Sequence, residues 1–167
     1  MPISPPTLQA EPATPWCFIA LRFPMAEAAQ HMDLAIQEVL GVLARQQRVP
    51  AGPLTCRHLA RPTTHFDLQL GFPLAEDLAM QGEGRVEWGT LPATWLLRTT
   101  YTGPYEGLAA AWGAFSAAVP AALASHPQRE PTGCFRERYL TDPSREPDPA
   151  RWATVLELEL RDGAGEK

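Results

Sequence analysis

The sequence lacks the features that mark several classes of protein. No apolar run is long enough to cross a bilayer, and residues 1–15, MPISPPTLQAEPATP, have neither the basic start nor the apolar run of a signal peptide. No basic block is present, and the net charge is −5 at pH 7, so we do not expect a nucleic-acid groove. The sequence therefore predicts a cytoplasmic protein that binds neither membranes nor nucleic acid directly.

Cysteine is scarce, and recognisable cofactor motifs are missing. The three cysteines, Cys17, Cys56 and Cys134, are widely spaced, and without an export signal we interpret them as reduced thiols. Cys56 with His58 and His65 fits no zinc spacing, and a fourth ligand is missing. The chain also has no glycine-rich phosphate loop. We therefore expect no metal and no cofactor.

The composition is that of one globular domain with a substantial core. The chain has 167 residues, of which 45% are hydrophobic and 20% charged, so it is not disordered by composition. Prolines cluster in residues 1–15, which we interpret as an extended lead-in, and residues 161–167 are expected to form a flexible tail. The predicted domain spans residues 16–160.

Periodicity predicts the same order of elements in two halves, at about 16–74 and 84–160. The first half has predicted strands at 16–23, 54–60 and 64–72 and a helix over 25–47, in which Met32, Ile36, Val39 and Leu43 recur at helical spacing. The second half has a short lead strand at 84–89 and further strands at 93–101, 134–140 and 152–160. Its helix is expected to begin with Gly103 as N-cap and Pro104 at the first position, and to kink or end at Pro120.

This order predicts an α+β fold built from two pseudo-twofold β-α-β-β repeats. We expect antiparallel sheets, two long helices on one side of them and a ligand cleft between the repeats.

One carboxylate stands out because it interrupts an aromatic face. Strand alternation places Phe135, Glu137 and Tyr139 on one face, and Arg136 and Arg138 on the other. A buried acid must be paired, hydrogen-bonded or protonated. Its partner is either an internal donor or arginine, or the cation of a ligand, to which aromatic walls would add about 0.5–2 kcal/mol each.

Three segments in this order, TTYTGPYEGLAAAW, RERYLTDP and LELEL, resemble the GyrI-like small-molecule-binding domains, which include effector-binding domains of bacterial transcription activators. The residues that match the family's two motifs are Gly103, Pro104, Tyr105, Glu137, Tyr139, Leu140, Asp142 and Pro143. The resemblance covers roughly Leu8 to Leu160. It implies a cleft that binds apolar, often cationic molecules, with Glu137 projecting into it. Pro120, and Arg136 in place of an aromatic residue, depart from the pattern.

The resemblance implies a set of ligand-binding residues around Glu137, and it leaves three functions to weigh. The expected ligand-binding residues are Glu137, Tyr139, Tyr105, Trp112 and Trp152, although Trp112 lies on a helical stripe that is typical of a core. The leading hypothesis is a free-standing cytoplasmic protein that binds small molecules. The first alternative is a hydrolase of cyclopropane-bearing natural products, with Glu137 and either Tyr139 or Tyr105 as the catalytic pair. The second is a protein inhibitor of DNA gyrase, for which the net charge gives little support.

Overall fold

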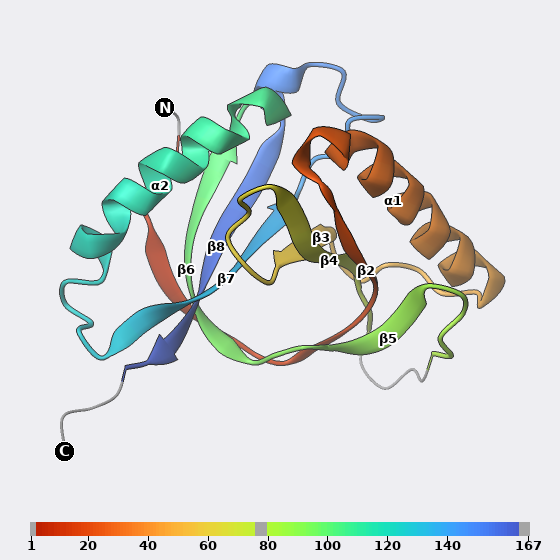
Figure 1. Cartoon of the computed structure of the whole chain (residues 1–167), viewed down its shortest axis with the longest axis horizontal. Coiled ribbons are helices and arrows are strands. Elements are labelled where there is room, and N and C mark those ends of the chain that lie inside the picture. The colour runs from red at the N-terminus through yellow and green to blue at the C-terminus, as the bar shows by residue number, and fades with distance from the viewer. Residues whose placement is uncertain (1–2, 76–79, 164–167) are drawn as a thin grey trace. The chain divides into compact units, whose positions relative to one another are not determined.

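The computed structural model describes residues 3–75 and 80–163, which form two compact units (Figure 1). Residues Pro12–Ala93 form the N-terminal unit, and Met1–Glu11 together with Thr94–Lys167 form the C-terminal unit. Both units combine antiparallel strands with one long helix, so the α+β prediction is confirmed. Among the described residues, no helix has both the length and the apolarity to cross a bilayer.

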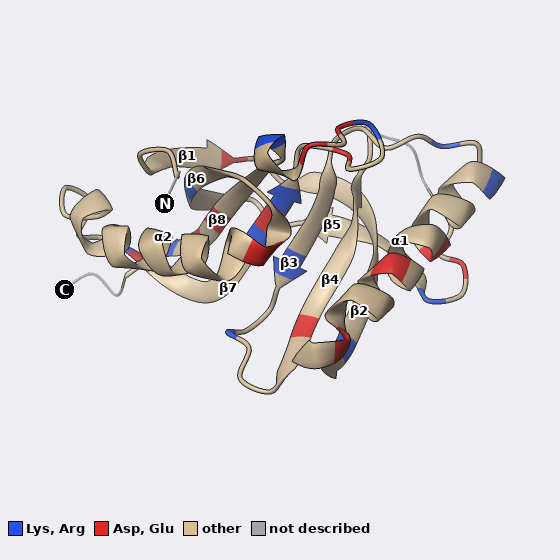
Figure 2. Cartoon of the chain, turned by 90° about the horizontal axis from the view of Figure 1, so that it is seen from above, with Lys and Arg blue, Asp and Glu red and all other residues tan. Residues whose placement is uncertain are grey.

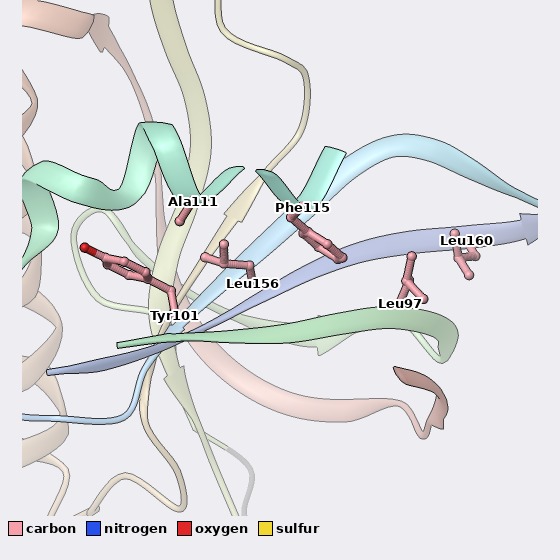
Figure 3. Close-up of a cluster of buried hydrophobic side chains, with 6 residues drawn as sticks. All are labelled: Leu97, Tyr101, Ala111, Phe115, Leu156 and Leu160. Atoms are coloured by element: carbon pink, nitrogen blue, oxygen red, sulfur yellow. The ribbon is translucent and has the colours of Figure 1, made fainter. Parts of the chain in front are cut away.

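The C-terminal unit is a four-stranded antiparallel sheet in the order β1-β6-β8-β7. Its elements are β1 (Thr7–Glu11), β6 (Thr94–Thr102), the 3-10 turn η2 (Tyr105–Gly107), α2 (Leu108–Ala122), β7 (Arg129–Tyr139), the 3-10 turn η3 (Pro149–Arg151) and β8 (Ala153–Asp162). Helix α2 lies over one face of this sheet (Figure 1). The core between them consists of Leu97, Tyr101, Ala111, Phe115, Leu156 and Leu160, and Figure 3 shows how the α2 side chains point toward β6 and β8.

The N-terminal unit has the corresponding sheet, in the order β5-β2-β4-β3. Its elements are β2 (Thr14–Pro24), the 3-10 turn η1 (Met25–Glu27), α1 (Ala28–Arg45), β3 (Leu54–His58), β4 (His65–Pro73) and β5 (Val86–Leu91). Helix α1 buries Ala35, Val39, Val42 and Leu43, so Val39 and Leu43 of the predicted stripe are in the core, and Met32 and Ile36 are half-buried. The predicted order of strand, helix, strand, strand is therefore present in both units.

The N-terminal segment contains a strand that the periodicity did not reveal. Residues Thr7–Glu11 pair with β6 from Thr7 opposite Arg98 to Glu11 opposite Thr94. This strand belongs to the C-terminal unit, although the N-terminal unit follows it directly in sequence. At the other end of the chain, β8 continues to Asp162, and residues 164–167 of the predicted tail lie outside the described residues.

The start of the second helix differs from the prediction. Gly103 is not the N-cap: Pro104 occupies that position before η2, and Gly107 occupies it before α2. The reason is the phenol of Tyr101, whose hydroxyl donates to the carbonyl oxygen of Pro104 at 2.9 Å. A Cβ atom would lie 2.5 Å from this hydroxyl at Gly103 and 2.0 Å at Gly107. The two glycines therefore leave room for Tyr101 beneath the turn, and Gly103 has a φ of 149° that favours glycine.

Pro120 lies inside α2, which ends at Ala122. Proline inside a helix lacks the N–H for the i→i−4 bond and clashes with the preceding turn, and α2 ends two residues after it. The helix is also free of charge: α2 has no acidic or basic residue, whereas α1 has both (Figure 2). The charged side chains of the C-terminal unit lie on its strands, turns and loops instead.

Candidate functional site

Strand β7 directs Glu137 toward the face of the sheet that α2 covers. Glu137 lies opposite Leu156 of β8, and Leu156 belongs to the core beneath α2. Phe135 and Tyr139 flank Glu137 on the same face because side chains alternate along a strand. Glu137 is buried, with 8% of its surface exposed. The predicted face of this strand is therefore present.

The carboxylate of Glu137 accepts hydrogen bonds from two aromatic side chains. The indole Nε1–H of Trp112, on α2, donates to Oε1 at 2.7 Å. The hydroxyl of Tyr139 donates to Oε2. Although Cα atoms two residues apart on a strand are separated by roughly 6.5–7 Å, the side chains of Glu137 and Tyr139 lean together. Both oxygens are thus occupied by neutral donors.

These donors give each carboxylate oxygen one hydrogen bond without supplying a positive charge. Within residues 3–75 and 80–163, no Lys, Arg or His side chain forms an ion pair with Glu137. The neighbouring Arg136 projects to the opposite face, where its Nε donates to Glu159 at 2.7 Å. Arg138 also lies on that face and pairs with Glu157. Arg136, which departs from the family pattern, is therefore not the counter-ion of Glu137.

Three further aromatic side chains extend this site along the sheet and the adjoining turns. The ring of Tyr105, in η2, meets Tyr139 edge-on with centroids 5.7 Å apart and contacts Trp152 at 4.7 Å. On the other side of Glu137, Phe135 meets the ring of Trp112 at 4.9 Å. We call Glu137, Trp112, Tyr139, Tyr105, Trp152 and Phe135 the Glu137 cluster. It contains all five of the predicted site residues and adds Phe135, which strand alternation already placed on this face.

The turns around the Glu137 cluster are held by specific bonds. The indole of Trp152 donates to the carbonyl oxygen of Glu146 at 2.9 Å, and the backbone N–H of Gly103 donates to the carbonyl oxygen of Trp152 at 2.8 Å. Asp142 accepts bonds from the backbone and hydroxyl of Ser144, which keep the pKa of this exposed carboxyl below its usual value. The aromatic rings are thus carried on turns that are fixed by their own hydrogen bonds.

Tyr105 experiences the negative charge of the cluster. Partial burial raises the pKa of its phenol, and the nearby carboxylates of Asp142 and Glu137 raise it further. Burial is the larger cause, and the part due to the two carboxylates reflects negative charge near the phenol. The cluster as a whole therefore combines an apolar aromatic wall with a negative potential.

Two hollows in the N-terminal unit are lined by residues outside the Glu137 cluster. A cavity of about 270 Å³ in the N-terminal unit lies between α1 and β5, and its lining includes Glu38, Arg45, Glu83 and Arg85. These four side chains form two ion pairs with each other, Arg45 with Glu83 and Arg85 with Glu38. None of the predicted site residues lines it.

Comparisons with known proteins identify the fold through structure alone. No protein-family model matches the sequence, and no curated protein matches it. The crystal structure of the EcmrR C-terminal domain aligns with a TM-score of 0.69 and 17% identity, over 97% of this chain and 99% of that one. EcmrR in the cryo-EM structure of the EcmrR–DNA complex in EcmrR-RPo aligns with a TM-score of 0.70 and 17% identity, over 96% of this chain but 58% of that one.

Two further structures share the fold. SAV2435 bound to tetraphenylphosphonium aligns with a TM-score of 0.58 and 12% identity, over 93% of each chain. A hydrolase from Listeria innocua aligns with a TM-score of 0.58 and 10% identity, over 93% of this chain and 91% of that one. At these identities the likeness shows a shared fold and does not assign a ligand or a reaction.

Proposed function

We propose that this protein binds apolar, cationic small molecules, with Glu137 as the counter-ion. The observation that carries the proposal is a buried carboxylate that has two neutral donors and, within the described part of the chain, no ion pair with a protein cation. Removing a charge from water without pairing it is costly, so a ligand cation is a natural partner for Glu137. The aromatic rings around it would add cation–π attraction of about 0.5–2 kcal/mol each.

The structural neighbours support this class of ligand without fixing it. SAV2435, which shares the fold, was solved with tetraphenylphosphonium, a large apolar cation. EcmrR, which also shares it, was solved in a complex with DNA, whereas this chain spans 58% of that EcmrR chain. We infer a binding protein that recognises the cationic group of its ligand.

A pair of ions of nearly the same shape and opposite charge tests the role of Glu137. By titration calorimetry, we expect tetraphenylphosphonium to bind with a Kd in the micromolar range, about −8 kcal/mol, and tetraphenylborate to bind far more weakly. Glu137→Gln should weaken the binding of the cation at least tenfold, which is about 1.4 kcal/mol, because the amide keeps the shape and loses the charge.

Glu130→Gln supplies a matched control on the same strand. Glu130 is exposed and forms an ion pair with Arg161, so its loss should leave the binding of tetraphenylphosphonium unchanged. If Glu137→Gln and Glu130→Gln weaken the binding of tetraphenylphosphonium equally, the effect comes from the net charge of the protein and not from a specific counter-ion. If both ions bind the wild-type protein alike, Glu137 is not a counter-ion and the proposal is wrong.

The hydrogen bond between Tyr139 and Glu137 favours a second candidate, a hydrolase. A carboxylate bonded to a phenol is a plausible acid–base pair, and a hydrolase is among the structural neighbours. We rank it second because, among the described residues, the hydrogen bonds of Glu137 include no further polar group that would orient a water, whereas a cation needs only the charge of Glu137 and the surrounding rings. Mass spectrometry of a cyclopropane-bearing alkylator after incubation decides between the two. A water adduct that forms catalytically with the wild-type protein and is lost in Glu137→Gln would establish the hydrolase.

A further inference from the structure

The N-terminal unit contains a buried thiol–imidazole pair that the proposed function does not use. Cys56 and His58 are two residues apart on β3, and Cys56 Sγ lies 3.5 Å from His58 Nε2. The two residues are 0% and 5% exposed. The imidazole also meets the ring of Phe66 edge-on, with centroids 5.5 Å apart. Two groups with strong affinity for metals thus converge inside an apolar core.

This pair occupies the position in its own sheet that Glu137 and Tyr139 occupy in theirs. Pro24 and Pro104 each precede the 3-10 turn that opens the helix of their unit, so we align the two units on these prolines. Ile19 of β2 and Thr99 of β6 each lie five residues before the proline and therefore correspond to each other. Thr99 lies opposite Leu156, which lies opposite Glu137. In the same way Ile19 lies opposite Leu70, which lies opposite Cys56.

The same correspondence extends to the next residue of the site and to the helix. His58 lies opposite Leu68 as Tyr139 lies opposite Thr154, so the two-residue motif is repeated in register. Trp112, the donor to Glu137, lies four residues after the start of α2 at Leu108. Met32 lies four residues after the start of α1 at Ala28. The set Glu137, Tyr139 and Trp112 of one unit therefore corresponds to Cys56, His58 and Met32 of the other.

We propose that Cys56 and His58, with Met32 as a third ligand from α1, form a binding site for a soft univalent metal ion such as Cu(I). Thiolate and thioether sulfur prefer Cu(I), and imidazole also suits copper. Among the described residues no three His, Cys, Asp or Glu side chains gather around one point, so a zinc ion would lack its four ligands. Cu(I) accepts two or three ligands; Cys56 and His58 would supply two, and Met32 is assigned as the third from the correspondence between the two units.

The binding step is balanced without any change of oxidation state. The Cys56 thiol releases one proton as the S–Cu bond forms, and neutral His58 contributes a nitrogen lone pair. Copper stays Cu(I) throughout.

Competition with the chromophoric chelator bicinchoninate, under nitrogen and without added thiols, tests the site. We expect the wild-type protein to withdraw one Cu(I) per chain from the chelator. Cys56→Ser and His58→Gln should each weaken binding at least tenfold, and Met32→Leu should weaken it less. The other two cysteines provide matched controls: Cys17→Ser and Cys134→Ser should retain wild-type affinity, because neither thiol is one of the three expected ligands.

Several results would overturn this inference. They are the absence of Cu(I) withdrawal by the wild-type protein, retained affinity in His58→Gln, and loss of affinity in Cys134→Ser. If Cys56→Ser does not fold, as circular dichroism would show, His58→Gln decides alone because it keeps the thiol. The measurement does not involve Glu137, so its outcome is independent of the proposed binding of organic cations.

Discussion

At the scale of single residues, the environment of Glu137 differs from that of the other buried acids in the C-terminal unit. Glu157 and Glu159 are buried against arginines, whereas Glu137 is buried against an indole and a phenol. Arginine neutralises a carboxylate, and neutral donors leave its charge in place. This contrast separates an acid with a structural partner from an acid that can take a cation from a ligand.

Tyr105 offers a direct probe of the negative potential at the cluster. Since burial and the carboxylates of Asp142 and Glu137 raise its pKa, it should ionise above the usual value of about 10. A raised folded-state pKa favours the neutral phenol in the folded protein. The associated stability is complete below the unfolded pKa and is lost as the pH rises through the folded pKa.

Spectrophotometric titration of tyrosinate measures this shift. Subtracting the curve of Tyr105→Phe from that of the wild type should isolate a transition above pH 10, and Glu137→Gln should move this transition to lower pH. A difference curve centred at or below the value of free tyrosine would contradict the predicted negative potential.

At the scale of elements, the turn between β6 and α2 determines where Tyr105 and Trp112 lie. Tyr101 fills the space beneath this turn, and Gly103 and Gly107 leave that space open. The Gly-Pro-Tyr-Glu-Gly segment is therefore shaped by a side chain that precedes it. The position of the aromatic wall depends on this packing.

Gly107→Ala should lower the free energy of unfolding by about 1–3 kcal/mol, because its Cβ would collide with the Tyr101 hydroxyl in a packed core. Gly113→Ala on the same helix has nothing within 4 Å of the new Cβ and should raise stability by about 0.5–1 kcal/mol. Urea unfolding measures both. Combining Gly107→Ala with Tyr101→Phe should recover part of the loss, and an equal effect of the two alanines would rule out the collision.

Strands with a clear alternation of apolar and polar residues could be predicted from the sequence, whereas features that depend on tertiary packing could not. The alternation in FDLQL and LELEL predicted β4 and β8 because a half-buried strand has a period of two. Strand β1 was missed because five residues between prolines carry no such period. The N-cap was misplaced because the packing of Tyr101 is tertiary. For the same reason alternation placed Glu137 and Tyr139 on one face but could not show that Trp112 donates to Glu137, or that Cys56 and His58 touch.

At the scale of the whole molecule, charged side chains fasten the first strand of the chain to the C-terminal unit. Arg98 and Arg138 each pair with Glu157, and both also reach Glu11 of β1, at 3.5 and 3.2 Å. These four side chains form a closed ring that joins β1, β6, β8 and β7, the four strands of the sheet. The ring ties residues from the two ends of the sequence into one unit.

Glu157 is the fully buried member of this ring, with 0% of its side chain exposed. Glu157→Gln keeps the shape but removes the charge that Arg98 and Arg138 share, and breaking a buried ion pair costs about 3–5 kcal/mol. We expect the free energy of unfolding to fall by an amount near the lower end of this range, because the two arginine side chains are 24% and 16% exposed and remain partly hydrated. The midpoint of urea unfolding should fall accordingly. Glu38→Gln is the control, since Glu38 and Arg85 form an exposed pair whose loss should cost under about 1 kcal/mol. If the two variants lose the same free energy of unfolding, the ring of ion pairs does not stabilise the attachment of β1. The backbone pairing of β1 with β6 would then be sufficient.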